Sequence, residues 1–194
     1  MQYIPAHGDA AYHGVRVPFL VFRPSLLNIA SLGSPAEVVK LFELVMSDQD
    51  SRVQVIACMG ILMSCADDKD LACEAVGYHD GLGLYEPGEM PLEHIIHMAR
   101  HMLLHGMIGD VDIPAKPGVK PKPMTEFKAA DFVAMAIAHL GMSQADAWGL
   151  SMTALVAALN SKFPQVKEEK AGSDAPSIEE YEEAMEWFDK IRGN

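Results

Sequence analysis

Four histidines at regular spacing are the residues of this chain whose types and positions are best suited to chemistry. They form the pattern His94-x-x-His97-x-x-x-His101-x-x-x-His105. On a helix turning by about 100° per residue, these side chains fall within an arc of roughly 80° and form one stripe. Histidines four residues apart can bind one Zn²⁺ or Ni²⁺ together. Two ligands do not complete a structural site, and further ligands would have to come from His79, Asp80, Glu89, the cysteines or a second subunit.

The stripe therefore has two readings. We expect histidines at the margin of a packed face or an oligomer contact, and binding of a metal is the alternative. Because neutral histidine titrates close to pH 6.5, packed histidines predict a protein that is sensitive to pH near 6.

Other reactive patterns are absent from the sequence. It contains no HExxH, GxSxG, GxxxxGK[ST] or GxGxxG motif. The three cysteines, at positions 58, 65 and 73, include no CxxC pair, and the aspartates at 67, 68 and 70 lack the glycine and closing glutamate of a calcium loop. We expect no catalytic residue, no cofactor and no resident metal, hence a protein that is not an enzyme.

Composition limits the partners. The chain has 194 residues with 27 acidic and 15 basic side chains, a formal charge of −12. That charge disfavours nucleic acid and anionic membranes as partners. The first residues lack the pattern of a signal peptide, and no apolar run reaches the ~18 residues that a membrane span needs. A cytoplasmic protein rich in methionine, with 13 such residues, is expected.

The elements expected in the first part begin with a strand over 15–22, which Pro18 confines to a sheet edge, paired with residues 2–5. A short helix at 26–30 should end at Gly33, a second should start at Ser34 with Glu37 completing a capping box, and a third should start near Ser51. Residues 66–90 are acidic and rich in glycine, which predicts a long loop. Pro91 should open the helix of the histidine stripe, with Gly106 as its left-handed cap.

A proline- and lysine-rich stretch, 110–124, predicts a spacer between two parts of the chain. Beyond it we expect a helix over 126–140 closed by Gly141, a short helix capped by Ser143, and a helix that Pro164 stops. The predicted fold is mainly α, a compact multi-helix domain with a small N-terminal β-hairpin. Its divisions are a β-hairpin and helical domain at 1–109, the spacer at 110–124, a helical segment at 125–163, a flexible linker at 164–177 and an acidic helix at 178–194.

Apolar side chains in the last three divisions are candidates for binding a partner protein. The candidate residues are Trp148, Leu150, Leu155, Leu159, Phe163, Trp187 and Phe188. At helical spacing they could hold a partner helix in a groove, or they could form an ordinary core. The sequence leaves both readings open.

Three stretches resemble proteins of tailed phages. Residues 141–159, GMSQADAWGLSMTALVAAL, resemble the motif of tail assembly chaperones, in which a small helix ending in tryptophan precedes a Ser/Thr-capped helix. Residues 22–39 and 87–106 are similar to proteins of siphophages and prophages encoded between the major tail protein and the tape measure protein.

The resemblance implies a non-enzymatic helper in the host cytoplasm. It would hold the long, helical tape measure protein soluble while tail tube subunits polymerise around it, with the tail tube protein as a possible second partner. Helices at 125–163 would capture the client, and residues 165–194 would act as a tether or competitor. The alternatives are a phage structural or host-interacting protein forming a homo-oligomer, or a histidine-rich metal-binding protein.

Overall fold

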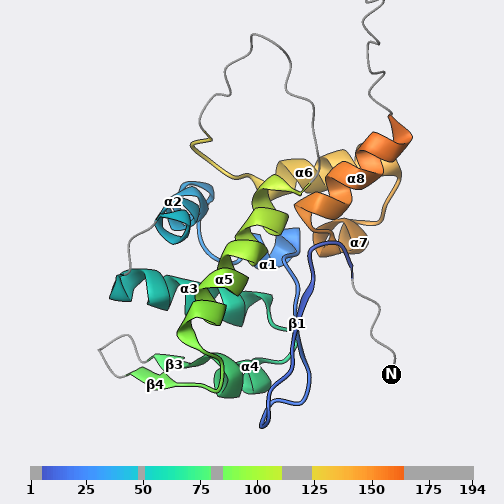
Figure 1. The fold of residues 1–194 in the computed structure, drawn as a ribbon. Coiled ribbons are helices and arrows are strands. Elements are labelled where there is room, and N and C mark those ends of the chain that lie inside the picture. The colour runs from blue at the N-terminus through green and yellow to red at the C-terminus, as the bar shows by residue number, and fades with distance from the viewer. Residues whose placement is uncertain (1–5, 48–50, 80–84, 111–123, 164–194) are drawn as a thin grey trace, which may run out of the picture. The chain divides into compact units, whose positions relative to one another are not determined.

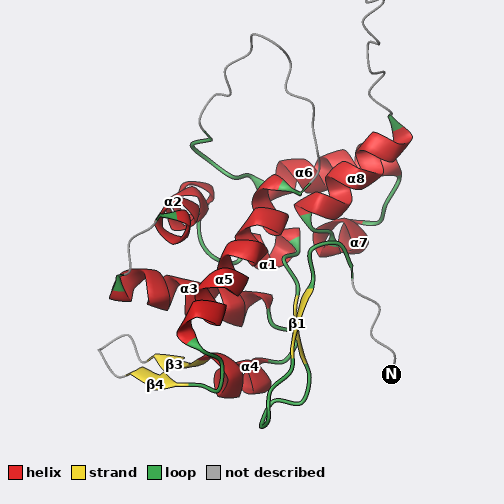
Figure 2. Ribbon diagram, viewed as in Figure 1, coloured by secondary structure: helices red, strands yellow, loops and turns green. Residues whose placement is uncertain are grey.

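The computed structural model describes residues 6–47, 51–79, 85–110 and 124–163. The chain divides into two compact units, Met1–Lys162 and Phe163–Asn194, and the elements below belong to the first. Helices account for 62% of the structure and strands for 9%, which confirms the prediction of a mainly α fold with a small N-terminal hairpin. The described residues contain two small antiparallel strand pairs, and Figures 1 and 2 show where they lie among the helices.

The N-terminal hairpin pairs β1 (Ala10–Tyr12) with β2 (Leu20–Phe22), with Ala10 opposite Phe22. The hairpin partner is therefore Ala10–Tyr12, whereas residues 2–5, the partner expected from the sequence, lie outside the described residues; the strand begins only at Leu20. Residues 13–19 form the connecting loop instead, closed by a 2.8 Å hydrogen bond from the Gly14 N–H to the Val17 carbonyl. All three residues of β2 are buried, so this strand joins the hairpin to the helical core.

Three helices follow: α1 (Leu26–Ala30), α2 (Pro35–Met46) and α3 (Arg52–Cys65). The predicted helix starts are confirmed. The Ser34 N–H donates to the Glu37 carboxylate at 2.8 Å, and the Ser51 hydroxyl accepts from the Gln54 N–H at 3.2 Å. These local caps satisfy amide groups that the first turn of a helix leaves without partners.

The long loop expected at 66–90 is wrong. It contains α4 (Lys69–Val76), β3 (Gly77–His79) and β4 (Tyr85–Pro87). The Asp68 carboxylate caps α4 by accepting from the amides of residues 70 and 71, both at 3.0 Å. The glycines serve close packing: a Cβ on Gly77, whose φ is +97°, would lie 2.3 Å from the Glu86 carbonyl oxygen.

The histidine-bearing helix α5 (Leu92–Leu103) begins after Pro91 as predicted and crosses α3 (Figure 1). It continues into a π-helical turn, η1 (Leu104–Ile108). The prediction of Gly106 as the left-handed cap is wrong, because Gly106 lies inside that turn and Gly109, with φ of +86°, ends it.

The last elements are α6 (Ala129–Met135), the π-helical turn η2 (Ala136–Leu140), α7 (Gln144–Gly149) and α8 (Met152–Lys162). The first of these starts three residues later than predicted. Gly141 is left-handed and Ser143 caps α7 with its hydroxyl, as predicted. The expected helix at 178–194 and most of the spacer lie outside the described residues.

One hydrophobic core joins elements from both sides of the spacer. Phe22, Leu62 and Met102 come from before it, and Phe127 and Leu155 from after it. Two backbone hydrogen bonds support this packing, from the Leu26 N–H to the Leu150 carbonyl at 2.7 Å and from the Phe127 N–H to the Pro35 carbonyl at 2.9 Å. The core therefore fixes α1, α3 and α5, whose surfaces contribute to the two grooves described next.

Candidate functional site

A groove of about 770 Å³ lies on the surface of α1, α2 and α3 beside the start of α4. We call it the α1–α3 groove. Its lining residues are Leu27, Asn28, Ser31, Leu32, Leu41, Ala57, Gly60, Ile61, Met63, Ser64 and Lys69. The side chains that could contact a ligand are mostly apolar, and Leu27 is 55% exposed. Open apolar grooves between helices are a common place for another helix to bind.

Gly60 is the unusual residue of this groove. It is exposed in the middle of α3, and a Cβ built on it would meet nothing within 4 Å. Glycine inside a helix costs about 0.5–1 kcal/mol relative to alanine. No packing within the described part of the chain requires this glycine. Its absent side chain leaves room for another backbone to approach α3 closely.

The polar groups of the groove are bonded within the chain. The hydroxyls of Ser31 and Ser64 lie 2.7 Å apart, and the Asn28 carbonyl oxygen lies 2.7 Å from the first and 3.1 Å from the second, so one hydroxyl donates to the other and the other donates to this carbonyl. The Lys69 ammonium donates to carbonyls at the end of α3, including those of Ser64 at 3.0 Å and Ala66 at 3.1 Å. With these groups engaged, the groove favours an apolar ligand.

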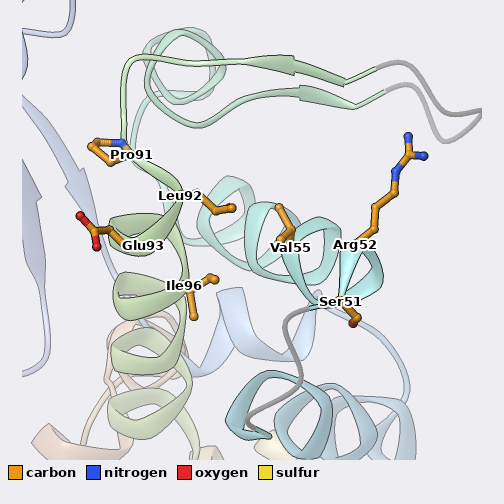
Figure 3. A pocket seen from close by; sticks show the side chains of 7 residues that line it. All are labelled: Ser51, Arg52, Val55, Pro91, Leu92, Glu93 and Ile96. Atoms are coloured by element: carbon orange, nitrogen blue, oxygen red, sulfur yellow. The ribbon is translucent and has the colours of Figure 1, made fainter.

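A second groove, of about 630 Å³, lies between the first turns of α3 and α5. We call it the α3–α5 groove. Figure 3 shows Leu92 and Ile96 pointing from α5 toward α3, which carries Val55, whereas Glu93 points to the other side of α5 and Arg52 extends away from the start of α3. The side chains between the two helices are therefore apolar.

The histidine stripe divides between the surface and the packing. His94 and His97 are exposed, whereas His101 and His105 are half-buried with ring centroids 4.2 Å apart. His101 Nε2 bonds the Gly8 carbonyl at 3.1 Å, and His105 Nδ1 bonds the hydroxyl of Thr153 at 2.8 Å. Over the described ranges, no three His, Cys, Asp or Glu side chains come together as metal ligands would. These two imidazoles fasten the N-terminal segment and α8 to α5 and η1.

Burial controls the ionisation of the groups that could react. It is the main cause that lowers the pKa of His101, and the nearby charge of His105 acts in the same direction. Burial raises the pKa of Cys58 to about 11 and that of Cys65 to about 12. Thiols with such values stay protonated at neutral pH and are poor nucleophiles and metal ligands.

The structure separates the apolar residues that the sequence singled out for partner binding. Leu155 is 1% exposed and belongs to the core, while Trp148, Leu150 and Leu159 are partly buried against it and Phe163 is 50% exposed. Trp187 and Phe188 lie outside the described residues. The groove residues Leu27 and Gly60 escaped sequence reasoning, although a glycine inside an otherwise apolar helix was a signal that could have found one of them.

Comparisons with known proteins place the chain in a family. The model of a family described as "Family of unknown function (DUF6246)" matches residues 44–183, and the chain belongs to this family. No curated protein and no solved structure matches it. Within the described residues, the helices are too short or too polar to cross a membrane.

Proposed function

We propose that this DUF6246 member is a tail assembly chaperone of tailed phages, which binds the tape measure protein in the host cytoplasm and catalyses no reaction. The observation that carries the proposal is the α1–α3 groove, an open apolar surface around an exposed glycine that internal packing does not require. A chaperone for a long helical client needs a surface of this kind, because it must cover the apolar faces of the client's helices by binding alone, without catalysing a reaction.

The client would bind as a helix laid along α3. Its apolar face would contact Leu27, Leu41 and Met63, and its backbone would pass close to Gly60. Methionine adapts its shape to different neighbours, which suits a client with many similar but unequal helical segments. The charge of −12 would keep the complex of chaperone and client soluble.

The tryptophan-bearing segment would support this groove through contacts with α1. Both α6 and α7 contact α1, which carries Leu27, and the Leu26 N–H bonds the Leu150 carbonyl at the end of α7. Trp148 is partly buried against the core there. The motif at 141–159 would therefore position the α1 side of the groove.

The test is co-expression of the full chain with the tape measure protein, followed by size-exclusion chromatography with light scattering. We expect co-elution and a tape measure protein that is soluble only with the wild-type chain. A chain that elutes alone as an oligomer beside an insoluble or indifferent partner would refute the proposal and favour a structural or host-interacting protein.

Gly60→Leu locates the client site. The new side chain would fill the groove, so co-elution should be lost, whereas the fold should persist because a Cβ at Gly60 meets nothing within 4 Å. Glu43→Leu is the control, since Glu43 is exposed on α2 and does not line the groove. Equal binding by both variants would exclude this groove.

Trp148→Ala tests the supporting role. We expect weaker binding of the tape measure protein by a chain that still unfolds cooperatively. If circular dichroism shows the variant to be unfolded, Trp148 is a core residue and the supporting role proposed for it is wrong.

A further inference from the structure

Residues 6–9 form a closed turn that lies against the histidines of α5 and η1. The Asp9 N–H donates to the Ala6 carbonyl at 3.1 Å, and the Ala6 N–H donates to the Asp9 carboxylate at 3.2 Å. Gly8 packs directly on η1: its φ is +90°, and a Cβ built on it would lie 2.6 Å from Cβ of His105. We call residues 6–9 the N-terminal strap.

Two side chains hold the N-terminal strap, one on α5 and one at the start of α8. His101 Nε2 donates to the Gly8 carbonyl at 3.1 Å, and the Ser151 hydroxyl donates to the His7 carbonyl at 2.6 Å. Because a carbonyl only accepts, His101 carries its proton on Nε2, and its Nδ1 is the nitrogen that takes up a second proton in acid. The Ser151 hydroxyl also accepts from the Ala154 N–H at 3.1 Å, so the strap is bonded to the residue that caps α8.

The two imidazoles next to the strap are arranged for the neutral state. The ring centroids of His101 and His105 lie 4.2 Å apart, so two positive charges there would repel each other. The Thr153 hydroxyl accepts from the Asp110 N–H at 2.9 Å and lies 2.8 Å from His105 Nδ1, to which it can donate only while that ring is neutral. Burial is the main cause that lowers the pKa of His101.

The charges around the pair do little to offset a proton on His101. His97, one turn earlier on α5, acts against the charged ring, as His105 does. Asp110, just after η1, favours the charged ring, but its effect is smaller than those of burial and His105. Other titratable groups on the elements that pack here are His7 and Asp9 of the strap, Arg23 after β2, Arg100 on α5 and Lys162 at the end of α8. Arg23 lies 3.7 Å from the Asp9 carboxylate, and Arg100 donates to carbonyls at the end of α2.

We propose that the N-terminal strap is a pH-sensitive switch, in which proton uptake by His101 and His105 in mild acid releases residues 6–9 from α5 and from the start of α8. Release hydrates both rings, which the closed strap keeps half-buried. The open form therefore binds protons more tightly. Its population rises as the pH falls below about 6.5, by up to about tenfold per pH unit for each proton that it takes up.

Release of the strap is a local event. The hydrophobic core of the described residues begins at Val17 and includes none of residues 6–9. Segments without buried apolar contacts open at a lower free energy than the core. The strap lines neither groove, so the switch does not depend on the proposed client site.

Hydrogen exchange of the full chain, followed amide by amide by NMR between about pH 7.5 and 5.5, tests the switch. Each rate is compared with that of an unstructured chain at the same pH, which gives a protection factor. In the wild type, the protection factor of the Asp9 amide should fall about tenfold over this range. The amide of Leu62, a fully buried residue of α3, should be protected at least about a hundredfold more at every pH, because the strap opens without unfolding the core.

Three variants identify the histidines that respond. His101→Gln keeps a donor for the Gly8 carbonyl but cannot be protonated, so most of the fall in Asp9 protection should disappear. His105→Gln keeps an acceptor for the Thr153 hydroxyl, removes the second charge and should also reduce the fall. His94→Gln, which changes an exposed histidine of the same helix, is the control and should behave like the wild type.

Three results would each overturn the inference. They are an Asp9 protection factor that does not change with pH in the wild type, a fall in His101→Gln as large as in the wild type, and equal protection of the Asp9 and Leu62 amides. Circular dichroism of each variant ensures that folded chains are compared. If His101→Gln does not fold, His105→Gln decides by the same criterion.

Discussion

At the scale of single residues, the Glu89 carboxylate holds the β1–β2 loop by accepting backbone hydrogen bonds. Its carboxylate lies between the β1–β2 loop and the start of α5, and its backbone hydrogen bonds join parts of the chain more than 70 residues apart. The hydrogen bonds from Val15, Arg16 and Val17 favour the ionised form and lower the pKa of Glu89 below its ordinary value of 4.5. The contribution of this side chain to stability therefore depends on pH.

Protonation of Glu89 in acid should weaken these hydrogen bonds and lower the stability of the fold. Because the pKa of Glu89 is lower in the folded chain, its stabilisation is complete above pH 4.5 and is lost as the pH falls through the folded pKa. Glu89→Gln should lower the urea midpoint at neutral pH and flatten its decline between about pH 5 and pH 3. Glu86→Gln, which removes an exposed carboxylate from β4, is the control. A decline equally steep in Glu89→Gln and wild type would contradict the prediction.

His101 gives a second dependence on pH, in a higher range. Burial and His105 lower its pKa below the ordinary 6.5, so the folded chain favours the neutral imidazole. Because the unfolded chain binds this proton more tightly than the folded chain, the free energy of unfolding is highest above pH 6.5 and declines as the pH falls below that value. His101→Gln keeps a donor for the Gly8 carbonyl and removes the titration. Thermal midpoints measured between about pH 8 and 5.5 should fall less in this variant than in the wild type. His94→Gln, an exposed neighbour on α5, should follow the wild type.

At the scale of secondary-structure elements, three glycines within or at the end of helical elements have different roles. A Cβ on Gly106 would lie 2.5 Å from Cγ1 of the fully buried Ile29, so this glycine lets η1 pack against α1. Gly109, with φ of +86°, ends the π-helical turn. Gly60 has open space around it. Only the surroundings, not the residue type, separate these roles.

Alanine at two of these positions should have opposite effects. Gly106→Ala forces Ile29 to move inside a packed core, for which we expect a loss of about 1–3 kcal/mol in the free energy of unfolding. Gly60→Ala meets no atom and improves helix propensity, for which we expect a gain of about 0.5–1 kcal/mol. Urea denaturation of both variants checks the pair. A Gly106→Ala variant as stable as the wild type would show that η1 and α1 are not tightly packed.

The contrast also explains what the sequence could predict. Helix starts at Ser34, Ser51 and Ser143 were predictable because a cap and the amide it binds lie within three residues of each other. The loop expected at 66–90 was wrong because Gly77 is needed for contact with the distant backbone of Glu86, which no local pattern reveals.

The grooves were beyond sequence reasoning for a related reason. Leu27, Leu41 and Gly60 lie on three helices and line one surface only after those helices pack together. The histidine stripe could be predicted only in part. Its helix and its shared face follow from spacing, but the partners of His101 and His105, on Gly8 and Thr153, come from the two far ends of the described chain.

At the scale of the whole molecule, the buried core runs from Val17 to Leu155 among the described residues and lies wholly within the unit Met1–Lys162. The chain shortened to residues 1–162 therefore keeps every described core residue. We expect it to unfold cooperatively, because the packed side chains that make the described core are all retained. Loss of cooperative unfolding would contradict this expectation.

The same shortened chain tests the proposed site for the tape measure protein. Trp187 and Phe188, predicted from the sequence as partner-binding residues, are removed with residues 163–194, while the α1–α3 groove is kept intact. If the groove is the client site, the shortened chain should still co-elute with the tape measure protein, and Gly60→Leu in that chain should abolish co-elution. Loss of binding by the shortened chain with a normal unfolding transition would instead locate the client site in the C-terminal segment, because the fold that forms the groove would still be present.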